Sequence, residues 1–289
     1  MISKLGLCLL LLVCLGVASA WSQEGEGIQT EPEEEFQYPF QLIPHRPNYV
    51  LPLSWSSDTG NINQAAIDPE FQLDHMEIHF QLSLKFPIRE EFIFQDSPLW
   101  LGYTIRSFWQ AYNTDVSRPF RETNHEPELF WEIPSTIRFW GFDNTSNTLI
   151  INHQSNGQSG ELSRSWNRVM VASRWEHGNL TFVATPWAKT PHEITIDAGL
   201  VEDNPDITEY LGYFDLLTLY QRGEQQFSMN LRNNLSHRNR GSVELRWAFP
   251  LRQSFKGLVT YFNGYGESLI DYNHSQERLS IGIQMSDWY

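Results

Sequence analysis

The chain has 289 residues, and its 35 acidic side chains outnumber 20 Lys and Arg, which gives a formal net charge of −15. This balance argues against a nucleic-acid partner and favours divalent cations over anionic ligands. After the first twenty residues, no apolar stretch approaches the roughly 18 residues that a membrane-spanning helix requires.

Residues 1–20 are typical of a secretory signal peptide. Lys4 precedes an apolar run from Leu5 to Val17, and Ala18-Ser19-Ala20 forms an A-x-A cleavage site. The run is too short to cross about 30 Å of hydrocarbon as a helix. Both cysteines, Cys8 and Cys14, lie inside this segment, so we expect an exported protein without disulfides.

Residues 21–74 are expected to be an N-terminal extension. This segment carries an acidic run at residues 31–35 and prolines at Pro39, Pro44, Pro47 and Pro52. Because proline cannot donate a hydrogen bond within a sheet, the segment is interpreted as irregular rather than as strands.

Residues 75–289 carry the pattern of a transmembrane β-barrel. Ile78, Phe80, Leu82, Leu84 and Phe86 alternate with polar residues, and similar stretches recur at 99–105, 149–151, 169–171, 243–249 and 279–285. Strands of about ten residues suit a bilayer better than a soluble sandwich, and this length leaves room for about ten to fourteen strands. Abundant Trp and Tyr near strand ends, and a last expected strand that finishes on Tyr289, favour the same fold.

One expected strand places a histidine and a serine on its apolar face. His153 and Ser155 have the parity of Leu149 and Ile151, so all four are expected to face lipid. An imidazole beside a serine hydroxyl can take its proton during nucleophilic attack.

A second strand, after a loop of roughly eight residues, could complete this site. Asn167 would then lie beside His153 and accept a hydrogen bond from its ring, and the N–H of Gly157 could approach an oxyanion. On spacing alone, two ordinary polar side chains remain the alternative.

The sequence resembles the outer membrane phospholipase A family. The resemblance rests on residues 153–157 and 163–168, with further matches at 119–124, 203–208 and 264–273, in the family's order from about residue 45 to 289. It implies an antiparallel barrel of twelve strands in the outer membrane of a Gram-negative bacterium. It also implies calcium-dependent hydrolysis of phospholipid acyl esters by a Ser-His-Asn triad in a reversible homodimer.

Carried over by position, Ser155 would be the nucleophile, His153 the general base and Asn167 its orienting partner, with Gly157 as oxyanion donor. The resemblance further implies Ca²⁺ ligands at the Ser163 side chain, the Gln158 carbonyl, the Ser117 carbonyl of the other subunit and, for a second position, Asp203. Two departures are visible. Gln158 stands where the family often has Arg, and residues 190–201 are longer than usual.

The expected function is therefore an outer-membrane phospholipase with A1 and A2 activity, and lysophospholipase activity is also expected. A non-catalytic pore or structural barrel is the main alternative, and a soluble secreted β-sandwich lipase is another.

Overall fold

The computed structural model describes residues 42–59, 73–115, 119–190, 203–252 and 255–288. Their strands form one antiparallel sheet. Its main members are β2 (Tyr49–Ser56), β3 (Met76–Arg89), β4 (Leu99–Trp109), β5 (Phe120–Pro134), β7 (Phe142–Ser155), β8 (Ser165–His177), β9 (Leu180–Thr190), β10 (Phe214–Arg222), β11 (Gln225–Asn233), β12 (Gly241–Arg252), β13 (Phe255–Tyr265) and β14 (Ser275–Gln284). Two-residue strands, β1 (Ile43–Pro44) and β6 (Arg138–Phe139), pair with β3 and β7.

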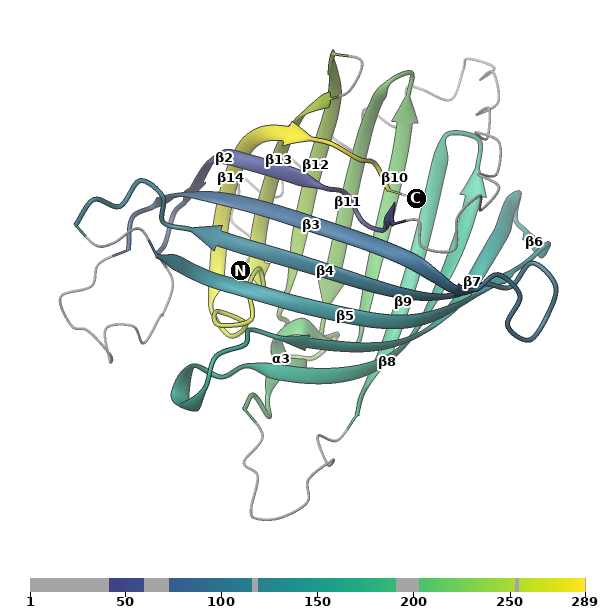
Figure 1. Cartoon of the computed structure of the whole chain (residues 1–289), viewed down its shortest axis with the longest axis horizontal. Coiled ribbons are helices and arrows are strands. Elements are labelled where there is room, and N and C mark those ends of the chain that lie inside the picture. Colours follow the sequence, from purple (N-terminus) through teal and green to yellow (C-terminus); the bar gives the residue numbers. More distant parts are fainter. Residues whose placement is uncertain (1–41, 60–72, 116–118, 191–202, 253–254, 289) are drawn as a thin grey trace. The chain divides into compact units, whose positions relative to one another are not determined.

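These twelve long strands close into a barrel, because β14 pairs with β2 and β2 pairs with β3. Figure 1 shows β3, β4, β5, β7 and β8 sweeping across the front of the wall, while β10 to β14 stand behind them. The predicted antiparallel barrel of about twelve strands is confirmed. Turns at Gly178 and Gly223, both with positive φ, join β8 to β9 and β10 to β11. The expected signal peptide lies outside the described residues.

The predicted boundary at residue 75 is wrong, because β2 lies inside the segment interpreted as an extension. Strand β2 is the member that closes the barrel, and it contains Pro52. The pairing of β2 with both neighbours shifts register around this proline, between Leu51 and Ser54 on one side and between Ile281 and Ile283 on the other. A proline at such an irregularity does not have to donate to a ladder, so it is tolerated in the wall.

The end of the last strand also differs from the expectation. Strand β14 stops at Gln284, so the final aromatic residue does not end it, and Tyr289 lies outside the described residues. Beyond the strand, the N–H of Met285 donates to the carbonyl of Asn48 at 2.7 Å. Trp288 lines a cavity inside the barrel.

The barrel is apolar outside and polar inside. Large apolar side chains exposed on the wall include Leu82, Leu101, Leu129, Phe227, Trp247, Leu279 and Ile281. The intervening positions are buried and polar, as at Glu77, His79, Gln81, Ser83, Glu126, Glu128, Arg246 and Ser280. This inversion of a soluble protein's polarity is what a barrel surrounded by lipid requires.

Among the described residues, no helix is both long and apolar enough to cross a membrane.

Among the described residues, networks of ion pairs cross the lumen. In the first, Glu77 binds Arg121 at 2.9 Å and Arg278 at 2.8 Å, while Arg121 also binds Asp271 at 2.6 Å. In the second, Arg46 binds Glu126 at 2.8 Å and Glu128 at 2.7 Å. Because these charges are buried or, for Arg46, half-buried and all are paired, they link distant parts of the chain without leaving unpaired charge in the networks.

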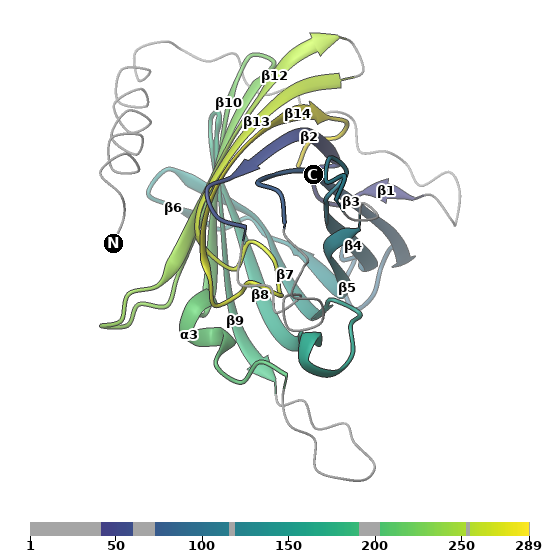
Figure 2. The same ribbon diagram turned by 90° about the vertical axis from the view of Figure 1, so that its left-hand side faces the viewer.

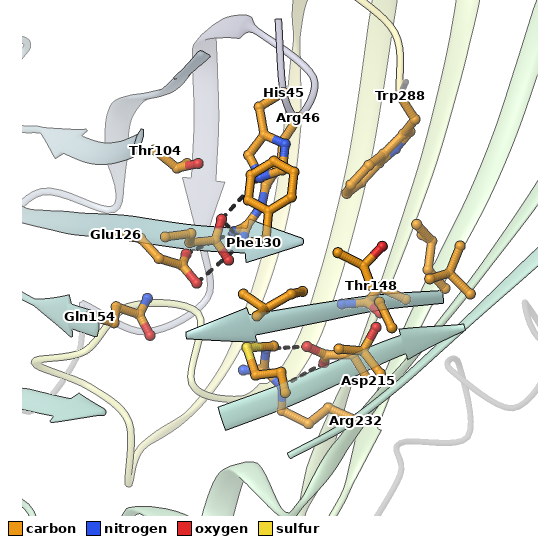
Figure 3. A pocket seen from close by; sticks show the side chains of 18 of the residues that line it. His45, Arg46, Thr104, Glu126, Phe130, Thr148, Gln154, Asp215, Arg232 and Trp288 are labelled. Atoms are coloured by element: carbon orange, nitrogen blue, oxygen red, sulfur yellow. Dashed lines mark hydrogen bonds and ion pairs between the residues drawn. The ribbon is translucent and has the colours of Figure 1, made fainter. Parts of the chain in front are cut away.

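The second network borders a cavity of about 460 Å³ in the lumen. Figure 3 shows Arg46 and Glu126 on one side of the cavity and the Asp215–Arg232 ion pair on another. Phe130 and Trp288 add aromatic surface to its lining.

One mouth of the barrel is filled by α3 (Ile207–Leu211) and the loop after β13. Ile207 and Leu211 pack with Trp166 of β8 and with Leu269 and Tyr272 of the loop. Figure 2 shows α3 beside the ends of β8 and β9. This apolar cluster supports the inner side of the wall at that end.

Replacing Glu77 by Ala tests the first lumen network. The change leaves Arg121 and Arg278 buried without their shared carboxylate, which should destabilise the barrel by about 3–5 kcal/mol. Urea unfolding in lipid vesicles, followed by the heat-dependent gel shift of the folded barrel, measures this loss. Asp143→Asn, which breaks the exposed pair between Arg138 and Asp143, is the control and should leave the midpoint unchanged. Equal midpoints for both variants would contradict a stabilising role of the network.

Candidate functional site

The candidate triad lies on the hairpin of β7 and β8. His153 pairs directly with Asn167 in the antiparallel register, and its Nδ1 lies 2.7 Å from the Asn167 side-chain oxygen Oδ1. Since an amide oxygen only accepts, Nδ1 is the donor in this contact. The other ring nitrogen, Nε2, then has its lone pair available for a proton from a hydroxyl group.

This hairpin presents the site to the lipid side of the wall. Leu149 and Ile151, which precede His153 on the same face, are 42% and 59% exposed. Their partners on β8, Val169 and Val171, are 39% and 45% exposed. His153, Ser155 and Asn167 are themselves partly buried. Because they share the face of these four residues, they extend an apolar row that the membrane would cover.

On the lumen face of the hairpin, directly behind the site, hydrogen bonds to charged side chains hold the strands together. Asn152, next to His153, is buried and accepts hydrogen bonds from the guanidinium of Arg168 at 2.7 and 3.0 Å. Its amide donates to Glu126 at 2.8 Å and to Glu128 at 3.0 Å. Strands β5, β7 and β8 are thus tied together beneath the triad, which limits the movement of His153 against Asn167.

Ser155 is the last residue of β7 and pairs with Ser165 on one side and His125 on the other. Gly157 follows with a φ of +66°, a conformation that a residue with a Cβ adopts only with strain. The position needs glycine for its backbone rather than for space, because a Cβ there would lie at least 3.7 Å from its nearest neighbours. Gly157 lies two positions after Ser155 in the chain, and it has no side chain of its own to shield its backbone N–H.

The loop between the two strands is held by Asn156, which sequence reasoning missed. This buried side chain donates to the carbonyl of Leu162 at 2.8 Å and accepts from the N–H of Arg164 at 2.9 Å. Asparagine closing a loop on its own backbone is a common turn device. In the sequence, this loop-closing role was signalled by an Asn directly before the Gly at the end of the strand.

The proposed calcium ligands are only partly assembled among the described residues. The Ser163 hydroxyl donates to Asp203 Oδ2 at 2.7 Å, and the Ser165 hydroxyl reaches the same oxygen at 3.1 Å. Gln158 is exposed in the same loop, and Ser117 lies outside the described residues.

The candidate ligand atoms at this position are oxygens, which Ca²⁺ prefers. A carboxylate already within hydrogen-bond distance of the Ser163 hydroxyl supplies the negative charge that such a site needs, so the residues fit a calcium ion. In the part of the chain that the structure describes, no group of three or more His, Cys, Asp or Glu residues forms another metal site.

The motifs noted at residues 203–208 and 264–273 meet behind the site. Tyr272 donates to Asp206 at 2.5 Å, and both burial and this carboxylate raise the pKa of the Tyr272 phenol. The Asn204 side chain accepts from the N–H of Ser165 at 2.9 Å. These contacts anchor the segment after residue 202 to the start of β8.

Comparisons with known proteins point to one family. A family model described as phospholipase A1 matches residues 26–285. Phospholipase A1 of Klebsiella pneumoniae is 36% identical over 256 residues, which cover 89% of this chain and 86% of the relative. Phospholipase A1 of Escherichia coli is 35% identical over 259 residues, covering 89% and 85%.

Solved structures agree with these relatives. Outer membrane phospholipase A from Escherichia coli superimposes with a TM-score of 0.79 at 36% identity, covering 86% of this chain and all of that one. A dimer of the Salmonella typhi outer membrane phospholipase with bound calcium gives a TM-score of 0.78 at 35% identity, covering 88% and 96%.

Proposed function

The chain belongs to the phospholipase A1 family, and we propose that it hydrolyses phospholipid acyl esters with Ser155 as nucleophile, His153 as general base and Asn167 as its orienting partner. The protein is a phospholipase of the outer membrane. The observation that carries the proposed triad is the 2.7 Å contact between His153 and Asn167 on the lipid-facing wall.

Each member of the proposed triad has a role. The contact to Asn167 keeps the proton of His153 on Nδ1, so Nε2 can take the proton of Ser155 as its oxygen attacks the ester carbonyl. His153 then returns that proton to the departing alkoxide of the glycerol. Asn167 carries no charge, so it orients the ring but stabilises the imidazolium less than an aspartate would.

The location of the triad determines how substrate reaches it. A phospholipid in the surrounding leaflet can present its ester to Ser155 without leaving the bilayer, since the apolar row formed by Leu149, Ile151, Val169 and Val171 lies alongside. An open wall imposes no narrow pocket on the glycerol backbone. We therefore propose hydrolysis at both the A1 and A2 positions, and of lysophospholipids as well.

Calcium is proposed as the cofactor, held by the Ser163 side chain, the Gln158 carbonyl and, from the other subunit of a reversible homodimer, the Ser117 carbonyl. Asp203 is proposed as a ligand of a second position, supported by its contact with Ser163. A bound calcium ion supplies positive charge that lowers the energy of a developing oxyanion. The N–H of Gly157 is proposed to donate to the same oxygen.

The triad is tested by three substitutions assayed on phospholipid in mixed detergent micelles with calcium. Ser155→Ala and His153→Ala should each lower kcat by a factor of about 10⁴ or more. Asn167→Ala should lower it by only about 10- to 100-fold, because it orients the base rather than acting as the base. The heat-dependent gel shift serves as the control for folding. Turnover that survives in folded Ser155→Ala would remove the proposed nucleophile.

The calcium site is tested by Ser163→Ala. Loss of this hydroxyl should raise the calcium concentration for half-maximal activity by about tenfold, with a parallel weakening of direct calcium binding by calorimetry. Ser236→Ala, an exposed serine in another loop, is the matched control and should leave both values unchanged. Identical calcium curves for the two variants would contradict the assignment of Ser163.

A further inference from the structure

A histidine and a tyrosine on the outer wall flank Ser155 on the side away from Asn167. His125 of β5 pairs directly with Ser155, and residues directly opposite in an antiparallel pair project from the same face. The hydroxyl of Tyr103 on β4 lies 2.8 Å from His125 Nδ1, and the two rings are stacked with centroids 6.2 Å apart. A polar pair on this face, in addition to the candidate triad, calls for a physical explanation, because lipid offers it no hydrogen-bond partners.

The free edge of the His125 ring faces the loop that follows Ser155. A Cβ placed on Gly157 would lie 3.7 Å from His125 Nε2 and 3.7 Å from Cδ2. The imidazole therefore lies beside the residue whose N–H is the proposed oxyanion donor. His125, paired with Ser155 across the sheet, and Gly157, two positions after it in the chain, thus lie next to each other beside this serine.

The contact with Tyr103 is compatible with His125 acting as a hydrogen-bond donor there. When the phenol donates to Nδ1, the neutral ring carries its proton on Nε2. When the ring is protonated, the phenol accepts from Nδ1 and Nε2 again carries a proton. In these two states, Nε2 presents an N–H toward the Gly157 side of Ser155; it lacks that proton only in the neutral tautomer whose Nδ1–H donates to the phenol oxygen.

We propose that His125 is a second oxyanion donor of the reaction, with Tyr103 as the residue that positions it. This inference rests on the proposed function, because it requires Ser155 to be the nucleophile. As the Ser155 oxygen bonds to the carbonyl carbon, its proton passes to His153 and the carbonyl electron pair moves onto oxygen. The resulting oxyanion accepts hydrogen bonds from Gly157 N–H and His125 Nε2–H.

His125 gains and loses no proton in this step. When the tetrahedral intermediate collapses, the carbonyl re-forms, the bond to the glycerol oxygen breaks, and that oxygen takes the proton from His153. A neutral imidazole that donates a fixed hydrogen bond stabilises the transition state without reorganisation. Contact with the lipid phosphate is the competing role, but the direct pairing with Ser155 places the ring at the reacting ester instead.

The experiment compares His125→Phe, His125→Gln and Tyr103→Phe in the calcium-loaded, full-length enzyme on phospholipid in mixed micelles. His125→Phe keeps a planar ring but removes the donor, so kcat should fall by about 10- to 100-fold while KM stays unchanged. His125→Gln retains an N–H and should recover part of the loss. Tyr103→Phe should lower kcat by less than His125→Phe, again at constant KM.

His177→Phe is the matched control, because His177 lies at the opposite end of β8 and binds the carbonyl of Gly141 at 2.8 Å. It should keep wild-type kinetics, and the gel shift checks that every variant is folded. A change carried by KM would assign His125 to the lipid phosphate and overturn the proposal, as would an unchanged kcat in His125→Phe. Ser155→Ala, run in the same assay, separates this outcome from a failure of the triad itself.

Discussion

The register of β7 against β8 is the constraint on which the site depends. It places His153 opposite Asn167 and Ser155 opposite Ser165. A slip of one residue would turn His153 and Ser155 into the lumen and bring buried polar side chains out to the lipid. The pairing of Asn152 with Arg168 on the inner face opposes such a slip, because each would lose a buried partner.

The polarity of the barrel explains why the lumen can support the site. A lipid-facing wall gives the proposed triad little polar support from outside, so the rigidity of the hairpin has to come from within. The charges of Glu126, Glu128 and Arg168 provide it beneath β7 and β8, and the cluster around Trp166 provides it at the mouth. A lumen crossed by such pairs also disfavours the alternative of an open, passive pore.

The alternation of apolar and polar residues was sufficient to predict the wall. Strands such as β3 and β12 repeat it over ten or more residues, and the parity of His153 and Ser155 follows from it directly. Strand β2 was missed because Pro52 is a strong signal against a strand, and only the tertiary pairing shows that it falls at an irregularity.

The supporting contacts were beyond sequence reasoning because they join residues far apart in the chain. Arg121 and Asp271 are separated by 150 positions, and Arg46 and Glu126 by 80. Neither pair can be predicted from the local sequence pattern, since each arginine could pair equally well with many other acidic residues of the chain. His125 shows the same limit. Its parity matches that of Leu129, which is exposed on the outer wall, but its place beside Ser155 depends on the register of β5 with β7.

The proposed function requires that a reactive serine faces the hydrocarbon around the barrel. It is tested most directly by adding an apolar alkylsulfonyl fluoride to vesicles that contain the protein and calcium, followed by mass spectrometry of the labelled peptides. We expect one adduct, on Ser155, that is lost in His153→Ala. Labelling at another serine, or the absence of any adduct in the folded, calcium-loaded protein, would contradict it.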